Sequence, residues 1–237
     1  MYNRKKEKVL SNFNNKCYKK GNPKKMIVFI HGYNGSPESI NYAVQSLYEK
    51  IEDAVIVVPR APFPCEKDEK NLQWLSFYAE DPNVRFRASD ASVEEIFGIF
   101  NRLWKSFADV AKQMNEFVDE QQKLWKINDG NTYIIGFSQG AMITIATSLL
   151  RKNKIGGAVS IAGIVPGFLQ LPNEINSKPK FLLLHGKDDV TVQYKTLPTT
   201  INWFKEQNIE FKNIEFDKLA HRMNDDEMKE IADFISF

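Results

Sequence analysis

Cysteine and histidine are both scarce in this sequence. Of the 237 residues only two are cysteines, Cys17 and Cys65, and only three are histidines. Neither cysteine belongs to a C-x-x-C pair and no histidine belongs to an H-E-x-x-H pattern, so we expect no bound metal ion. Two isolated thiols argue against a disulfide framework and favour a reducing compartment.

Long apolar runs are also missing. No stretch approaches the roughly 18 residues that a membrane-spanning helix needs, and no apolar signal-peptide core follows the first residues. With 43% hydrophobic and 26% charged residues, the composition is that of a globular protein with a substantial core. A length of 237 residues fits one α/β domain, and we expect a cytoplasmic protein.

Charge is unevenly distributed, although the net charge of +2 is close to balance. Residues 1–25 hold nine Lys or Arg and one Glu, which gives this segment +8 and leaves −6 for the rest. Such a basic lead-in segment could contact anionic lipid or nucleic acid. A solvated lead-in is the simpler interpretation, so we expect no nucleic-acid partner and at most a weak contact with a membrane surface. The folded domain is predicted to span residues 26–237.

Strand and helix patterns alternate along this domain. Short runs rich in β-branched and aromatic residues predict buried strands, whereas apolar residues at helical spacing predict amphipathic helices. The predicted strands span residues 26–30, 54–58, 132–137, 157–162, 181–184 and 211–217. The main predicted helices span residues 37–51, 92–125 with a break near 104–109, 195–208, and the chain from about 224. This alternation predicts a single α/β domain with a mainly parallel central sheet and helices on both faces.

The stretch around Ser138 carries the strongest chemical signal. A buried strand ends in Gly136-Phe137-Ser138-Gln139-Gly140, and residues 141–146 then read as a helix. A Gly-x-Ser-x-Gly match alone is weak, but a strand, a sharp turn and a helix around it make Ser138 a candidate nucleophile. In such a turn the backbone N–H of Gln139 points towards an oxygen that becomes negative beside the serine.

An acid and a histidine follow Ser138 in the chain order that this architecture requires. His221 comes after the last predicted strand, and Asp188 and Asp189 both follow the fifth. Because the carboxyl ends of parallel strands share one edge of the sheet, the three residues can meet there. His221 would accept the Ser138 proton, and an aspartate would orient the imidazole. Spacing alone does not choose between the two aspartates.

The loop after the first predicted strand is expected to complete the site. An oxyanion hole needs two N–H donors, and the backbone N–H of Tyr33 is the best placed to join that of Gln139. His31 and His185 each precede a glycine at a strand end. We expect these two histidines to stabilise loops, with a catalytic role as the weaker alternative.

Residues 59–107 are expected to shape the substrate pocket. Three prolines within residues 59–64 exclude regular strand pairing there. Trp74 and Phe77 belong to an aromatic cluster that could either line a pocket or join the core, and we take both as candidate substrate contacts. The apolar stripe that begins at Val93 is expected in the core, and a lid or insertion within residues 81–107 is the alternative.

These motifs resemble those of the phospholipase/carboxylesterase family of α/β-hydrolases, which includes acyl-protein thioesterases. The matching pieces are His31-Gly32, Pro59-Arg60-Ala61-Pro62 with Trp74, Gly136-Phe137-Ser138-Gln139-Gly140, His185-Gly186-Lys187-Asp188-Asp189-Val190, and His221. In the family's His-Gly-x-x-Asp pattern the acid is the fourth residue after the histidine, which selects Asp189. The resemblance implies an α/β-hydrolase fold that cleaves carboxylic esters or thioesters without a cofactor. Arg222 and the long 81–107 stretch depart from the family pattern.

The sequence therefore predicts a serine esterase or thioesterase that forms an acyl-enzyme on Ser138. The expected substrate is a small acyl ester or thioester, with a lysophospholipid or an acylated protein as further candidates. Lysophospholipase activity is the alternative within the enzymes, and a non-catalytic binding protein with a hydrolase fold is the alternative outside them. Acyl-chain length and oligomeric state do not follow from the sequence.

Overall fold

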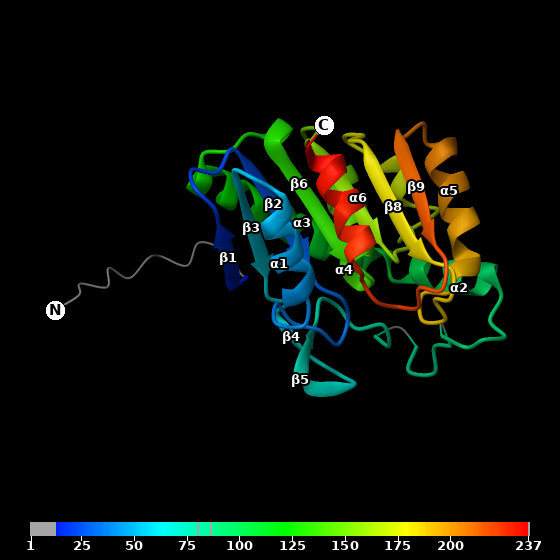
Figure 1. The fold of residues 1–237 in the computed structure, drawn as a ribbon. Helices are drawn as coiled ribbons and strands as arrows, with labels where there is room; N and C mark the ends of the chain where they lie inside the picture. Colours follow the sequence, from blue (N-terminus) through cyan, green and yellow to red (C-terminus); the bar gives the residue numbers. More distant parts are fainter. Residues whose placement is uncertain (1–12, 80, 86, 237) are drawn as a thin grey trace.

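A mostly parallel sheet of seven strands forms the centre of the molecule (Figure 1). The computed structural model describes residues 13–79, 81–85 and 87–236. From one edge to the other the strands are β1 (Asn15–Lys19), β3 (Ala54–Pro59), β2 (Lys25–Ile30), β6 (Thr132–Phe137), β7 (Gly157–Ile161), β8 (Phe181–Gly186) and β9 (Phe211–Phe216). Only β1 runs antiparallel to its neighbour among these strands.

Helices cover both faces of this sheet, as predicted from the alternating pattern. One face is covered by α1 (Asn41–Lys50) and α6 (Asp225–Ser236). The core on the other face contains side chains from α2 (Val93–Arg102), α3 (Trp104–Trp125), α4 (Gln139–Leu150) and α5 (Leu197–Glu206). Three short 3-10 turns are η1 (Asp129–Asn131), η2 (Leu171–Asn173) and η3 (Tyr194–Thr196).

The central strands are apolar along their whole length because both of their faces are buried. In β2, Val28 contributes to the core under α3 and α4, whereas Phe29 contributes to the core under α1 and α6. The same alternation places Ile134 and Ile135 of β6 on opposite faces. These strands therefore read as continuous hydrophobic runs in the sequence, without the alternation of a half-exposed strand.

The order of the strands places the site. From β2 the chain continues to β3 on one side, and β6 pairs with β2 on the other side, so the strand order reverses between β2 and β6. Loops that leave the carboxyl ends of two such strands diverge and open a crevice between them. The loop after Ile30 and the turn after Phe137 leave the sheet at this point.

Two features differ from the sequence-based expectation. Strand β1 lies within the predicted lead-in segment of residues 1–25 and pairs with β3 from Asn15↔Pro59 to Lys19↔Val55. The stretch expected to be irregular forms an antiparallel hairpin of β4 (Phe63–Cys65) and β5 (Asp68–Gln73). Proline excludes pairing only within a central strand, and a two-stranded hairpin consists of edges alone.

Smaller differences concern helix ends. Helix α1 begins at Asn41, later than predicted, and the break between α2 and α3 lies at Leu103. Residues 1–12 of the lead-in lie outside the described residues, so the nature of that segment stays a prediction. None of the helices in the described ranges has an apolar stretch long enough to cross a bilayer.

Candidate active site

Ser138 occupies the sharp turn between β6 and α4. Its backbone has φ 56° and ψ −118°, a conformation that non-glycine residues rarely adopt. A Cβ on Gly140 would lie 2.2 Å from the carbonyl oxygen of Ile30, so this glycine lets α4 pass close to β2. The strand, turn and helix around Ser138 are those predicted from the sequence, and they hold its backbone in the strained geometry.

Asp189 and His221 are joined by a hydrogen bond. Asp189 Oδ2 accepts from His221 Nδ1 at 2.7 Å. The other carboxylate oxygen, Oδ1, accepts from the backbone N–H groups of Thr191 at 2.8 Å and Val192 at 3.0 Å. These donors fix the direction of the carboxylate. Asp188 is exposed, and its backbone N–H donates to the carbonyl of Leu219. Of the two candidate acids, the structure therefore brings Asp189 to His221.

Close backbone contact holds the loop that carries Asp189 against the segment that carries His221. A Cβ on Gly186 would lie 2.1 Å from the carbonyl oxygen of Leu219, so only glycine fits at this point. The ring of His221 packs on the ring of Phe137, with centroids 4.7 Å apart. Because Phe137 directly precedes Ser138, this contact places the imidazole beside the turn between β6 and α4.

His185 and His31 are buried and bonded to loop backbone, the arrangement expected from the sequence. His185 Nε2 donates to the carbonyl of Val192 at 2.8 Å and lies 3.6 Å from Asp189 Oδ2. Burial lowers the pKa of His185. His31 Nε2 accepts from the N–H of Ala61 at 3.2 Å, and burial lowers the pKa of His31 to about 4. Both imidazoles are thus neutral near pH 7 and hold the loops at the site.

The loop after β2 lies against Ser138. A Cβ on Gly32 would sit 3.2 Å from the Cβ of Ser138, which puts the adjacent Tyr33 at the edge of the site. The buried side chain of Gln139 accepts from the N–H of Trp74 at 3.0 Å and donates to the carbonyl of Leu75 at 2.9 Å. The first turn of α4 is thereby tied to the segment that follows β5.

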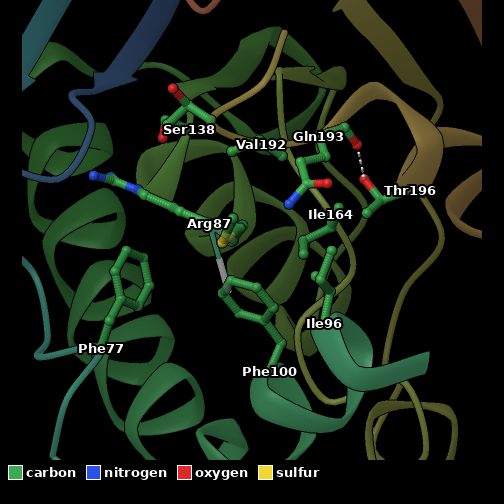
Figure 2. A pocket seen from close by; sticks show the side chains of 11 residues that line it. Phe77, Arg87, Ile96, Phe100, Ser138, Ile164, Val192, Gln193 and Thr196 are labelled. Carbon is green, nitrogen blue, oxygen red and sulfur yellow. Dashed lines mark hydrogen bonds between the residues drawn. The ribbon is translucent and has the colours of Figure 1, made fainter. Parts of the chain in front are cut away.

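A narrow pocket lies beside Ser138 (Figure 2). Its walls come from the segments that follow β5, β7 and β8 and from α2 and α4. They are formed by Phe77, Arg87, Ile96, Phe100, Ser138, Met142, Ile164, Thr191, Val192, Gln193 and Thr196. Figure 2 shows Ile96, Phe100 and Ile164 grouped on one side of this pocket. That apolar wall suits a hydrocarbon chain.

The two predicted aromatic substrate contacts have different positions. Phe77 lines the pocket, and its contact with substrate stays a prediction. Trp74 does not, because it is fully buried and its indole N–H donates to the carbonyl of His31 at 2.8 Å. The substrate contact predicted for Trp74 is corrected to a structural role, since this indole fastens the segment after β5 to the loop after β2.

No metal centre is present in the described parts of the chain. Among residues 13–79, 81–85 and 87–236, no group of three or more His, Cys, Asp or Glu side chains could hold a metal ion. Cys17 is exposed and Cys65 is buried, and both thiols are free.

Comparison with known proteins identifies the family at this point. Residues 16–237 match the sequence profile of the phospholipase/carboxylesterase family. The chain belongs to this family. Its α/β-hydrolase fold, expected from the alternation of strands and helices and from the family resemblance, is confirmed by that match and by the solved structures that resemble it.

Named relatives within the family are esterases and thioesterases. Acyl-protein thioesterase 1 of Candida albicans is 25% identical over 228 residues, which cover 90% of this chain and 91% of the relative. Carboxylesterase SOBER1 of Arabidopsis thaliana is 25% identical, with 88% of each chain covered. The crystal structure of esterase PE8 superposes with a TM-score of 0.80 at 19% identity and covers 94% of this chain and 98% of its own. The predicted class, a hydrolase of carboxylic esters or thioesters, is confirmed at the level of the family.

Arg87 and Gln193 are among the pocket residues that sequence reasoning did not single out. Arg87 lies in a polar stretch without helical or strand periodicity, and no motif marks it. Gln193 follows the acid loop, and its side chain donates to the carbonyl of Ala88 at 2.9 Å. Only the fold brings these distant segments together, so the sequence carried no signal for either residue.

Proposed function

We propose that this protein is a serine hydrolase in which Ser138, His221 and Asp189 form a catalytic triad. The 2.7 Å hydrogen bond between Asp189 and His221 carries the proposal, together with the strained turn at Ser138 and the contact of the His221 ring with the neighbouring Phe137. Asp189 holds the imidazole in one tautomer, with the proton on Nδ1, so that Nε2 can act as a base.

The reaction proceeds in two halves. Ser138 Oγ attacks the acyl carbonyl while His221 Nε2 takes the hydroxyl proton, and collapse of the tetrahedral intermediate expels the alcohol or thiol with that proton. Water then transfers a proton to His221 and attacks the acyl-enzyme. The carboxylic acid leaves and Ser138 regains its proton.

Two backbone N–H groups are proposed as the oxyanion hole, those of Tyr33 and Gln139. Within the described residues, neither group takes part in a backbone hydrogen bond. Gln139 is the first residue of α4, where the helix leaves its N–H groups without an intrahelical acceptor. Two such donors would stabilise the negative oxygen that develops in the tetrahedral intermediate.

Active-site labelling tests this proposal. A fluorophosphonate probe is expected to label Ser138 in the wild-type protein, and Ser138→Ala should lose both labelling and hydrolysis of 4-nitrophenyl butyrate. The exposed Ser89 gives a control, because Ser89→Ala should keep both. Full activity in Ser138→Ala would refute the mechanism. A folded wild-type protein that reacts with no serine-directed probe would favour the non-catalytic binding protein.

The proposed substrates are acyl esters and acyl thioesters, including acylated proteins. The apolar wall formed by Ile96, Phe100 and Ile164 supports an aliphatic acyl group. Two of the relatives named above carry the name acyl-protein thioesterase or carboxylesterase, which supports both ester and thioester cleavage here. An acyl-length series measured with matched esters and thioesters would show which bond and which chain length the pocket favours.

Lysophospholipase activity is the second candidate. One observation favours it: α2, from the stretch predicted as a lid or insertion, contributes Ile96 and Phe100 to the apolar wall. A single long acyl chain could lie along this helix. Faster hydrolysis of a lysophospholipid than of an acyl-protein thioester with the same acyl chain would establish this candidate, and the reverse order would exclude it.

A further inference from the structure

Arg87 introduces a positive charge into the pocket beside Ser138. Among the described residues that line this pocket it is the one charged side chain, since the others are apolar, hydroxyl-bearing or amide-bearing. In Figure 2 its stem runs below Ser138, and its guanidinium points away from Ile96 and Ile164. An acyl chain on the apolar wall would therefore place the leaving group on the side of the guanidinium.

The guanidinium lies next to the loop that carries the proposed oxyanion donor. Its central carbon is 5.6 Å from the centre of the Tyr33 ring, a cation–π distance. An arginine has five N–H donors in a planar fork, so it can be held by protein contacts and still bind an anion. A carboxylate or phosphate matches this fork with two parallel hydrogen bonds.

Arg87 also borders a second, shallower depression that Tyr33 helps to line. This depression is lined by Tyr33, Glu66, Lys67, Tyr78 and Arg87. Its one carboxylate, Glu66, accepts hydrogen bonds from Tyr33 Oη at 3.2 Å, from Gln73 Nε2 at 3.0 Å and from the N–H of Phe77 at 3.2 Å. Lys67 adds a second cation, so the charges around the depression favour an anion.

The segment that carries Arg87 is fastened to the loop that carries the acid. Gln193 Nε2 donates to the carbonyl of Ala88 at 2.9 Å, and Lys195 Nζ donates to the carbonyl of Ala91 at 2.5 Å. These bonds attach the segment of Arg87 to residues that directly follow the loop of Asp189. When a charge is held in place before the substrate arrives, less conformational entropy is lost on binding.

We propose that Arg87 selects esters and thioesters whose leaving group carries a carboxylate or phosphate close to the scissile bond. This inference rests on the proposed serine hydrolase function and specifies its substrate class. A neutral substrate of equal size would fill the same pocket without the paired hydrogen bonds. The anionic substrate is therefore favoured by interactions of its leaving group with the guanidinium.

Two matched thioesters test the inference. The butanoyl thioester of 3-mercaptopropionate carries a carboxylate, and the butanoyl thioester of 3-mercaptopropionamide replaces it with a neutral amide. The wild-type protein should hydrolyse the carboxylate with a kcat/KM about tenfold higher, as expected for a charged hydrogen-bonded pair. Added salt should reduce this ratio, because it screens a partly exposed charge.

Arg87 variants separate recognition from support of the fold. Arg87→Gln should lower kcat/KM for the carboxylate about tenfold and change that for the amide less than threefold. For the carboxylate, the kcat/KM of Arg87→Lys should lie between those of the wild type and Arg87→Gln, because lysine keeps the charge but lacks the planar fork of N–H donors. Arg85→Gln is the control, since Arg85 is exposed, pairs with Asp90 at 2.7 Å and should leave both substrates unaffected.

Three outcomes would overturn the inference. Equal kcat/KM for the two thioesters in the wild-type protein would exclude anion selection and leave the esterase function intact. If Arg87→Gln lowered kcat/KM equally for both substrates, Arg87 would instead be a residue that supports the Tyr33 loop. No hydrolysis of either thioester, or of any other ester, by the wild-type protein would overturn the proposed function along with the inference.

Discussion

At the scale of single residues, Asp188 and Asp189 show how neighbours in the chain acquire different roles. Both follow β8, but the Asp189 side chain points inwards and accepts from Thr191 N, Val192 N and His221 Nδ1. Asp188 is exposed. The backbone of the turn decides which carboxylate reaches the imidazole, and a count of residues along the chain does not.

This difference gives a matched pair of variants. Asp189→Asn should lower kcat by about 10³- to 10⁴-fold, because an amide cannot stabilise the imidazolium and favours the wrong tautomer. Asp188→Asn should leave kcat within about twofold, the scale of an exposed substitution. Ester hydrolysis of both variants, with circular dichroism to verify folding, measures the difference. Equal losses would mean that Asp189 is not the orienting acid.

His185 offers a second prediction at this scale. Its Nε2–H donates to the carbonyl of Val192, and the N–H of Val192 in turn donates to Asp189 Oδ1. His185→Phe removes that bond but keeps a ring, so Asp189 should lose its fixed direction. We expect kcat to fall about tenfold, the effect of one lost buried hydrogen bond, with KM nearly unchanged. A rise in KM at constant kcat would contradict a positioning role.

At the scale of elements, the site depends on how closely α4 and β6 pass their neighbours. Any side chain at Gly140 would meet the carbonyl of Ile30 in β2, and any side chain at Gly136 would meet the carbonyl of Gly140 at 2.1 Å. These contacts involve backbone, which cannot move without shifting a strand. The two glycines of the pentapeptide therefore define the distance between helix and sheet beneath Ser138.

Alanine substitutions at two glycines test this packing. Gly140→Ala should destabilise the protein by about 3 kcal/mol, because overpacking against backbone forces an element to shift. Gly98→Ala in α2 is the control: its Cβ would meet only Arg102 Nη1, at 3.9 Å. Removing a helical glycine there should stabilise by about 0.5–1 kcal/mol. Urea unfolding of both variants measures these changes, and similar values for the two would contradict the packing argument.

At the scale of the whole molecule, one buried carboxylate links global stability to pH. Glu227 is 1% exposed in the first turn of α6 and bonds to the N–H of Asn224. Burial, opposed by the hydrogen bond from Asn224 and aided by the charge of Asp189, raises the pKa of Glu227 to about 7. The folded state thus keeps a proton that the unfolded chain releases near pH 4.5. Glu227 therefore lowers the stability as pH rises from about 4.5 to 7.

Glu227→Gln should remove this pH-dependent cost. The amide oxygen can still accept from Asn224, so the variant should melt roughly 5 °C above the wild type at pH 8 and close to it at pH 4.5. Glu230→Gln on the same helix is the control, since Glu230 forms a partly exposed pair with Lys212. Thermal unfolding at both pH values is the measurement. An equal shift at both pH values would mean that ionisation of Glu227 is not its cause.

Much of the architecture follows from local sequence signals. Six of the seven strands in the main sheet and the main helices were predicted, because burial on both faces leaves continuous apolar runs and helices leave a 3.6-residue period. The pairing of β1 was missed, since its five residues are mostly exposed. The β4–β5 hairpin was missed because the prolines argued against a strand, although proline is tolerated in an edge strand.

The sequence by itself determined the α/β class, the turn at Ser138 and the order of Ser138, Asp189 and His221. Those features depend on neighbouring residues and on chain order, and the family resemblance selected the acid. Only the tertiary structure decided that Trp74 is buried, that Arg87 enters the pocket and that α2 forms its wall. These outcomes depend on contacts between segments far apart in the chain, which no local pattern records. The pentapeptide around Ser138 is a local feature, whereas the pocket beside it is a product of the whole fold.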